Sequence, residues 1–368
     1  MPQIQDLLRA LDARFPWQRA EKWDQVGLHI GDRRAAANSV HVAYEASDAA
    51  LDEAAENGAD VVVVYHPLLF RPLEKLDFAD PTAALAARLI RENRALICVH
   101  TALDGAAPPH ALGDALAAQL GLENVRVAAP SGGGELVLVS VLVPDTDFEA
   151  VRAAMWEAGA GAIGAHYDEA SFACAGQGTF RPLPGAHPAV GAVGARETSR
   201  EMRVEVVAPA VKWPDVLAAA RAAHPYEEVA HSVTALLNTD VTQTYGPLRV
   251  GQVERQSLEN WLETVREKLN PPSLRVVIPP DFGAVETVAC SPGSGASFID
   301  KLAPGTIFVC GDIKHHDALK ARARGVALVD VTHAATETAA VPLMAQALES
   351  VPGLRVCREE RAFNPFSF

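Results

Sequence analysis

Four apolar runs in this sequence end in side chains that commonly bind metal ions, and this pattern constrains the fold more than any other feature. Each run has the length of a buried strand. The runs, with the polar residues that follow, are Val61–Val64 before Tyr65 and His66, Ala95–Val99 before His100 and Asp104, Thr306–Cys310 before Asp312 and His316, and Val326–Asp330 before His333 and Glu337. In open α/β sheets, ligands bind outside the carboxyl ends of the strands. The sequence therefore predicts one pocket built from both ends of the chain.

The order of helical and strand patterns predicts an α/β core that is interrupted by an inserted domain. Residues 1–130 alternate between the two patterns, and a βαβα pattern returns from Val285 onward. Between them, Pro130–Gly134 is typical of a linker, and two strand-and-helix units follow it, which favours a ferredoxin-like split fold. We expect a discontinuous α/β core with a mixed sheet at residues 1–130 and 251–368, and a ferredoxin-like α+β domain inserted at residues 131–250.

The expected helices follow from the 3.6-residue spacing of apolar side chains. They are Ile4–Phe15, Asp48–Asn57, Pro81–Asn93, His110–Leu120, Thr146–Ala158, Trp213–Ala223, Ser257–Leu269 and Ala339–Leu348.

Charge and hydropathy exclude several classes of partner. The net charge of −14 and a pI near 5.3 argue against a nucleic-acid partner, because such binding depends on clustered Lys and Arg. No apolar stretch approaches the roughly 20 residues that span a bilayer, and the N-terminus lacks the pattern of a signal peptide. The expectation is a cytoplasmic protein without a nucleic-acid or membrane partner. The five cysteines form no CxxC pair, so a zinc ribbon is not expected.

The chemistry of the candidate ligands favours a catalytic metal. His333 and Glu337 stand four residues apart, which places both side chains on one face of a helix. His66 and Asp104 follow other strands, and Glu337 could bridge two ions. Imidazole and carboxylate ligands without thiolates suit Zn, Fe, Mn or Co. Any single His at a strand end is more often a hydrogen-bonded structural residue, so the prediction rests on their agreement at one sheet edge.

The motifs that carry these residues resemble the Nif-three-like dinuclear-metal family, whose members are often described as GTP cyclohydrolase I type 2 homologues. The similarity covers nearly the whole chain. It includes residues 21–32 (EKWDQVGLHIGD), 65–70 (YHPLLF), 100–104 (HTALD), 290–295 (CSPGSG), 311–317 (GDIKHHD) and 330–337 (DVTHAATE). The resemblance also covers the insert, which is similar to CutA/PII-like domains in longer members of the family.

The resemblance implies two metal ions held by a His-His pair, an Asp, a His and a Glu. Carried over to this sequence, the ligands are Tyr65, His66, Asp104, His333 and Glu337. Tyr65 departs from the pattern, because it stands where the family has the first His of the pair. A phenol with an ordinary pKa of about 10 is a poor neutral ligand. One or two divalent ions are therefore expected: the second site is weaker or empty, or is completed by Tyr65, a water or a neighbouring His.

The remaining family positions suggest roles in proton transfer. His100 and His316 match positions that line the pocket. Either could be a general acid or base, or could hold a metal ligand in position without binding the metal itself. In the insert, His224, Glu227 and Glu228 could form another metal site, although a turn before a strand explains them better.

The leading hypothesis for function is a metal-dependent hydrolase that acts on a nucleotide-like or heterocyclic substrate through metal-bound hydroxide. Ring opening of GTP or phosphoester hydrolysis would use similar metal chemistry. The alternative is a non-catalytic, metal-stabilised scaffold or regulatory protein, and a third hypothesis is metal storage or delivery. The resemblance also implies a homohexamer with metal sites that face an internal cavity.

Overall fold

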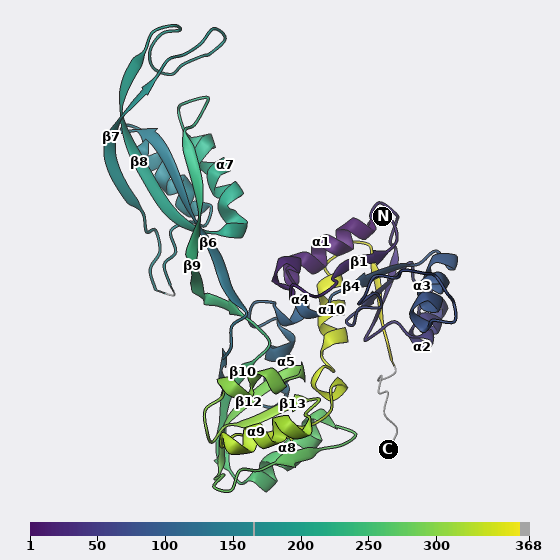
Figure 1. The fold of residues 1–368 in the computed structure, drawn as a ribbon. Coiled ribbons are helices and arrows are strands. Elements are labelled where there is room, and N and C mark those ends of the chain that lie inside the picture. The colour runs from purple at the N-terminus through teal and green to yellow at the C-terminus, as the bar shows by residue number, and fades with distance from the viewer. Residues whose placement is uncertain (165, 361–368) are drawn as a thin grey trace. The chain divides into compact units, whose positions relative to one another are not determined.

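The computed structural model describes residues 1–164 and 166–360, which fall into two compact units with several mixed and antiparallel sheets (Figure 1). Unit 1 comprises Met1–Ser131 and Tyr245–Phe368, and unit 2 comprises Gly132–Thr244. Both ends of the chain thus belong to one unit. Within the described residues, no helix combines the length and the apolar character needed to cross a membrane.

The first sheet of unit 1 has five strands in the order β1-β4-β3-β2-β15. Strands β4, β3, β2 and β15 run parallel, and β1 pairs antiparallel with β4 at the edge. Every residue of β2, β3 and β4 is buried, as expected for parallel strands that are covered on both faces. The bounds are β1 (Gly27–Ile30), β2 (Ser39–Ala43), β3 (Val61–Val64), β4 (Ala95–Cys98) and β15 (Arg355–Arg358).

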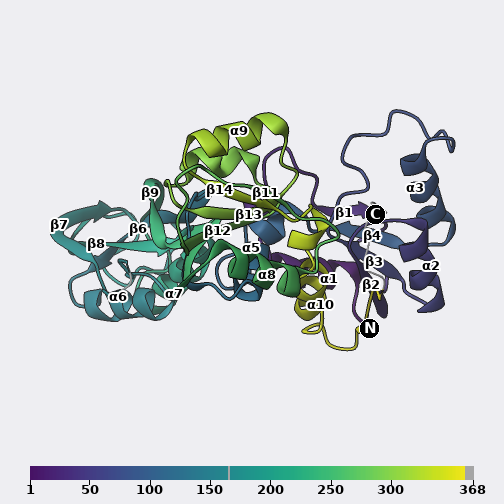
Figure 2. The same cartoon turned by 90° about the horizontal axis from the view of Figure 1, so that it is seen from below.

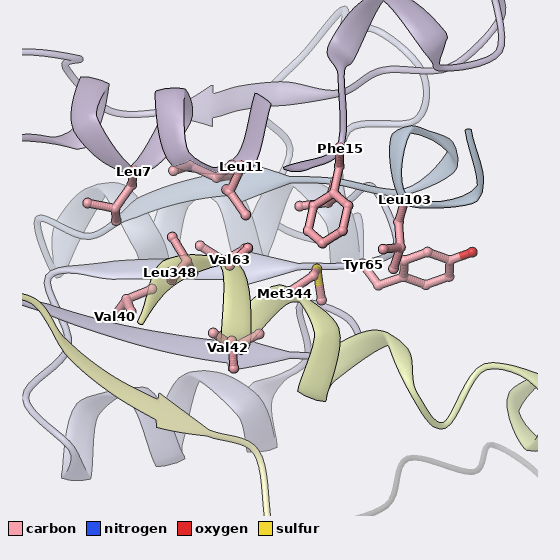
Figure 3. Close-up of a cluster of buried hydrophobic side chains, with 14 of the residues drawn as sticks. Leu7, Leu11, Phe15, Val40, Val42, Val63, Tyr65, Leu103, Met344 and Leu348 are labelled. Atoms are coloured by element: carbon pink, nitrogen blue, oxygen red, sulfur yellow. The ribbon is translucent and has the colours of Figure 1, made fainter. Parts of the chain in front are cut away.

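Helices pack on both faces of this sheet. The apolar stripes of α1 and α10 bury Leu7, Leu11 and Met344 in one cluster with the valines of β2 and β3 (Figure 3). Helices α2 and α3 cover the other face, where Leu51 and Leu89 are fully buried. The helices are α1 (Ile4–Arg14), α2 (Asp48–Glu56), α3 (Pro81–Arg91), α4 (Thr101–Asp104) and α10 (Ala340–Leu348), with the 3-10 turn η1 (Trp17–Arg19).

The second sheet of unit 1 has six strands in the order β11-β14-β13-β12-β10-β5. Its centre, β12-β13-β14, is parallel, and β10, β5 and β11 add antiparallel strands at the two sides. The strands are β5 (Glu123–Val127), β10 (Arg249–Gln256), β11 (Arg275–Val277), β12 (Val285–Ser294), β13 (Ile307–Gly311) and β14 (Ala327–Asp330).

This sheet is also covered on both faces, with α8 on one side and α9 on the other (Figure 2). Trp261 and Val265 of α8 join Leu116 of α5 in one core, while Ile299 and Ala321 pack against Phe308 on the opposite face. The elements are α5 (Leu112–Gln119), α8 (Leu258–Leu269), α9 (His315–Ala323), η3 (Ala296–Lys301) and η4 (Ala334–Thr336).

Unit 2 contains one four-stranded sheet in the order β7-β8-β6-β9, and its elements follow the chain order strand, helix, strand, strand, helix, strand. Strand β8 pairs antiparallel with β6 and β7. Val139, Val141 and Val204 of the sheet share a core with Val151 of α6 and Val216 of α7. The elements are β6 (Gly132–Pro144), α6 (Phe148–Glu157), β7 (Phe172–Phe180), β8 (Glu197–Pro209), η2 (Ala210–Lys212), α7 (Trp213–Ala223) and β9 (His231–Tyr245).

The eight helices expected from the sequence are all present, each within two residues of its predicted bounds. Two local expectations are wrong. The glycines expected in a linker are already part of β6, which begins at Gly132. The segment from His333 to Glu337 is the single 3-10 turn η4 rather than a helical face, with these two residues as its caps.

Candidate metal centre

Side chains from the strand ends of both sheets of unit 1 meet at one place. His66 lies just beyond β3, whereas His333 and Glu337 flank η4 after β14. The ligand atoms of these three residues all lie within 4.8 Å of one another. Within residues 1–164 and 166–360, no other group of three His, Cys, Asp or Glu side chains is arranged in this way. This group could hold a metal ion.

The buried Glu337 carboxylate is the centre of the group. Its Oε2 lies 3.2 Å from Nε2 of His333 and 3.7 Å from Nε2 of His66. The hydroxyl of Tyr44, at the end of β2, donates a hydrogen bond to the same oxygen. Burial and the charge of Glu337 raise the pKa of this phenol far above its ordinary value, so Tyr44 is a neutral donor that orients the carboxylate.

The pKa values of His66 and His333 are shifted in opposite directions. Burial lowers the pKa of His66 to about 4, which keeps its imidazole neutral and able to bind a metal at pH 7. Burial by itself would lower the pKa of His333 as well, but hydrogen bonds with Glu337 and Asp312 raise it to about 9. Asp312 Oδ2 lies 2.7 Å from Nδ1 of His333. This carboxylate–imidazole pair is the arrangement that fixes the ring of a metal-binding His.

Tyr65 and Asp104 form a buried pair beside this group. The Tyr65 hydroxyl lies 3.3 Å from each carboxylate oxygen of Asp104, and its ring is stacked with that of Tyr44. Figure 3 shows the hydroxyl pointing away from the aliphatic cluster that packs around the ring. Burial and the charge of Asp104 raise the pKa of the Tyr65 phenol well above its ordinary value. Tyr65 is therefore a neutral hydrogen-bond donor and not a phenolate.

Among the described residues, no Lys or Arg forms an ion pair with the carboxyl group of Asp104, and His100 is the basic side chain whose interaction acts to lower its pKa. Burial, followed by the charge of Glu337, raises the pKa of Asp104 to about 7. A buried carboxylate and a second, half-buried carboxyl group that interacts with it are unfavourable as a charged pair unless a proton or a cation compensates them. The electrostatics of the site thus fit a bound cation.

His100 is held in a network with Asp24 and Thr101. Its Nδ1 lies 2.7 Å from Oδ1 of Asp24, while Oδ2 of Asp24 accepts from the backbone N–H and the hydroxyl of Thr101 at 3.0 and 2.5 Å. Burial would raise the pKa of Asp24, but the hydrogen bonds from His100 and Thr101 outweigh it and lower this pKa. An ionised Asp24 accepts the proton of Nδ1, which leaves Nε2 of His100 free to accept another.

The backbone is strained where these side chains meet. His100, Asp312 and Thr332 all have positive φ, at 36°, 60° and 74°. Left-handed backbone is unusual for residues other than Gly, most of all for β-branched Thr, and costs on the order of 1–3 kcal/mol at each position. Such strain is retained where the surrounding structure requires a particular placement of side chains, and here it directs His100 and His333 toward the group.

A cavity of about 460 Å³ opens beside the group and gives a small molecule access to it. Its lining includes Tyr65, His100, Asp104, His333 and Glu337.

Gly293 keeps the space beside the ligands open. A Cβ atom added there would lie 2.6 Å from Oε1 of Glu337 and 3.1 Å from Nε2 of His333, so any side chain would occupy the position of a metal. The donor set, the buried carboxyl groups and this open space together fit a metal ion.

Other predicted residues lie elsewhere. His316 is exposed in the first turn of α9 and is not among the residues that line the cavity. In unit 2, His224 uses both ring nitrogens on the backbone, with Nε2 at 2.9 Å from the carbonyl oxygen of Leu142 and Nδ1 accepting from the N–H of Tyr226. It has no nitrogen left for a metal and serves to shape a turn.

Tyr44 and Gly293 were not among the predicted site residues, and Asp312 was predicted near the site without its role. Asp312 falls within a polar segment that the sequence did flag, but its pairing with His333 depends on the neighbouring strands β13 and β14. Tyr44 directly follows the buried strand β2, the type of position that identified His66 in the sequence. Gly293 and Gly295 belong to the same motif but have different neighbours, because a Cβ at Gly295 would meet Phe308 and Cys310 at 2.6 Å.

Comparisons with known proteins identify the family of this chain. The sequence model of the Duf34/NIF3 (NGG1p interacting factor 3) family matches residues 2–365. A "GTP cyclohydrolase 1 type 2 homolog" of Mycobacterium tuberculosis is 39% identical over 365 residues, covering 96% of this chain and 94% of that protein. The Bacillus subtilis protein of the same description is 32% identical over 371 residues, covering 99% and 98%.

Solved structures give the same result for the fold. A Bacillus cereus protein related to NIF3 superposes with a TM-score of 0.85 at 31% identity, covering 100% of this chain and 99% of that one. The Staphylococcus aureus protein SA1388 superposes with a TM-score of 0.73 at 25% identity, covering 100% and 99%. The chain therefore belongs to the Duf34/NIF3 family and resembles its GTP cyclohydrolase 1 type 2 homologues.

Proposed function

We propose that this protein is a metal-dependent hydrolase whose substrate is a nucleotide-like or other heterocyclic small molecule. The observation that carries the proposal is the convergence of His66, His333 and Glu337 on the wall of an accessible cavity. A structural metal site is usually closed by four protein ligands, whereas a catalytic one keeps positions open. Three ligands beside a cavity of about 460 Å³ favour the catalytic type.

His66, His333 and Glu337 would hold the first ion, and Asp104 with Tyr65 marks the position of a second. A divalent metal in this place supplies Lewis-acid polarisation of a substrate oxygen and a more acidic water. His333 must lose a proton before it can bind, because its pKa is about 9, so metal uptake at neutral pH releases protons. The neutral phenol of Tyr65 favours a second site that is weaker than the first.

His100 is the residue best placed to move a proton. Asp24 holds Nδ1, so that Nε2 is available on the cavity side to take a proton from a water or return it to a leaving group. The role of Asp24 is to fix the tautomer and orientation of the ring. His316 keeps its predicted catalytic role only if a rearrangement brings it to the cavity.

The aromatic side chains of the cavity support a planar substrate. Trp23 lines the cavity although its indole is 55% exposed, and it contacts Phe70 edge-to-face at 5.9 Å. Phe298 also lines the cavity. Exposed aromatic rings in a pocket offer a stacking surface for a heterocycle.

Elemental analysis of the purified, untagged protein and a hydrolysis assay on a panel of nucleotides and phosphoesters test the proposal together. The native protein should carry at least one transition-metal ion per chain and should lose hydrolysis on chelation. Glu337→Gln should remove both metal and activity, whereas Glu227→Gln, in unit 2, should change neither. A metal-loaded protein that hydrolyses none of the panel, together with a Glu337→Gln variant that loses only thermal stability, would contradict catalysis.

The second candidate is a metal-stabilised scaffold or regulatory protein without turnover. It is favoured by the neutral Tyr65 at a ligand position and by the sizeable unit 2. The same experiment separates the candidates, since a scaffold loses stability and assembly but no activity when the metal is removed.

The domain organisation and assembly remain parts of the proposal. The chain order strand, helix, strand, strand, helix, strand supports a ferredoxin-like, CutA/PII-like domain inserted between two segments of an α/β core. A homohexamer is expected on the family resemblance, and light scattering of the native protein tests it.

A further inference from the structure

The cavity of the candidate metal centre is lined by one positively charged side chain that forms no ion pair with the described residues. Arg19, the last residue of η1, is the only Arg or Lys among the described residues that line this cavity. Its guanidinium lies over the ring of Tyr245, 4.8 Å from the ring centre. It forms no ion pair or side-chain hydrogen bond with any side chain that the structure describes. Arg19 is half-buried, so this is not a freely solvated surface charge.

The backbone around Arg19 is fixed against the metal centre. Gly105, which directly follows Asp104, packs so closely that a Cβ atom there would lie 2.6 Å from the carbonyl oxygen of Arg19. Two residues further on, the N–H of Glu21 donates to the hydroxyl of Thr101 at 2.9 Å. The segment that carries Arg19 is therefore attached to α4, the helix that carries Asp104. The guanidinium is positioned before any ligand arrives.

The charges of the cavity explain what Arg19 could bind. Without a metal, the carboxyl groups of Glu21, Asp104 and Glu337 offset the charges of Arg19 and the protonated His333, so the cavity has no excess of positive charge to attract an anion. A divalent ion at the candidate ligands would compensate the charge of the carboxylates, so that an anion could contact both the ion and Arg19. A guanidinium pairs in bidentate fashion with phosphate and carboxylate groups. Hydroxyl groups of Ser294 and Ser297 line the same cavity and offer further donors.

We propose that Arg19 is the anion-binding residue of this cavity, and that the substrate carries a phosphate, phosphonate or carboxylate group which Arg19 holds beside the metal centre. The inference rests on the proposed function, because it requires the bound metal. It goes further by naming the chemical group that the substrate must contain and the residue that reads it.

Isothermal titration with small aromatic anions tests the proposal on the intact, metal-loaded chain. Phenylphosphonate and benzoate each join a ring to an anionic group, and they separate phosphate-like from carboxylate recognition. Benzyl alcohol is the neutral counterpart. We expect at least one of the two anions to bind more tightly than the alcohol, and chelation of the metal to abolish that binding.

Substitutions at Arg19 identify the residue responsible. Arg19→Met should weaken the anion on the order of 10- to 100-fold, as expected for a lost charged hydrogen bond. Arg19→Lys, which keeps the charge but not the bidentate geometry, should lose less. Arg34→Met is the matched control, because Arg34 is exposed and does not line the cavity, and it should leave the affinity unchanged.

Metal content, measured in every sample, separates the possible failures. If Arg19→Met and native protein hold the same metal and bind the anion equally well, or if native metal-loaded protein binds neither anion, the role of Arg19 is refuted while the metal centre stands. If Arg19 serves only to support Tyr245, the variants lose melting temperature and keep their affinity, which also refutes it. If the native chain takes up no metal, the proposed function itself fails and the inference falls with it.

Discussion

Two regions of this molecule combine a histidine, carboxylates and a cavity, yet only one of them is suited to a metal. In unit 1, His66 and His333 both direct Nε2 toward one buried carboxylate. In unit 2, Glu227 and Glu228 line a cavity of about 370 Å³, but His224 has both nitrogens committed to the backbone. The difference teaches that residue types close in sequence do not make a site. What matters is whether an imidazole nitrogen faces another candidate ligand, as Nε2 of His333 faces Glu337, or is used by the backbone.

The strongest test of this difference is a pair of histidine substitutions, one in each unit. His66→Ala removes a ligand, and since loss of supporting partners alone costs about 10–100-fold in metal affinity, we expect a loss of at least about 100-fold. His224→Ala should leave the metal affinity unchanged but lower the free energy of unfolding by about 1–3 kcal/mol, because it removes the hydrogen bonds with two half-buried backbone groups. Metal titration and chemical denaturation measure both. A loss of metal in the His224 variant would show that the two regions do not differ as described.

Asp104→Asn tests whether burial of this carboxyl group destabilises the metal-free protein at high pH. The folded pKa of Asp104 is about 7, above its unfolded value near 3.9, so in the metal-free protein its stabilising contribution is present at low pH and is lost as pH rises from about 4 to 7. The variant should therefore be more stable than metal-free native protein at pH 8, by on the order of 1–4 kcal/mol, with the difference shrinking toward pH 4. Urea denaturation at several pH values measures it. Equal stability of the variant and native protein at pH 8 would mean that burial does not destabilise the ionised form of Asp104.

Tyr65→His should restore the imidazole that the family resemblance implies. We expect the variant to bind one more metal ion per chain than native protein, or to bind its second ion about tenfold more tightly, because a neutral imidazole replaces a neutral phenol. Tyr65→Phe is the control that removes the hydroxyl without supplying a ligand. Elemental analysis decides, and an unchanged metal content in the histidine variant would show that the second position lacks more than a nitrogen.

The smallest effect is expected at His316, which is exposed at the start of α9. His316→Ala should leave hydrolysis within about twofold of native protein, because surface substitutions away from a site change little. His100→Ala, measured beside it, should cost on the order of 10²–10⁴-fold in rate, the usual contribution of a general acid or base. Comparable losses in both variants would restore His316 to the site.

Local sequence patterns predicted many of the helices and strands of this chain, but not which strands pair with one another. Helix α1 has a clear apolar stripe and β3 is a run of four buried valines, so both follow from the sequence pattern, whereas α9, which buries only Ala321, was not predicted. Strand β7 was not predicted, because its residues are mostly exposed and include Gly176 and Gly178. The pairing of β15 with β2 joins segments from opposite ends of the chain, and no local pattern encodes it.

The site residues also divide into those that a local pattern predicts and those whose roles depend on the folded sheets. His66, His333 and Glu337 could be predicted because each stands close to the end of a buried strand, where the fold class places ligands. Tyr44 and Asp312 could not be assigned roles, because their roles are defined by contacts with Glu337 and His333 that only the folded sheets create. The opposite pKa shifts of His66 and His333 likewise depend on burial and on neighbours from other strands.

The distance along the chain between the parts of the site has a consequence for biosynthesis. Tyr44 and Glu337 are in contact although 293 residues separate them. At roughly 5–20 residues per second, a ribosome needs about 15–60 s to make that stretch. During this interval the nascent chain exposes His66 but offers no complete set of ligands, and all of unit 2 is synthesised in between. The proposed metal centre would therefore have a complete set of ligands only after the segment that carries Glu337 has been synthesised and has docked.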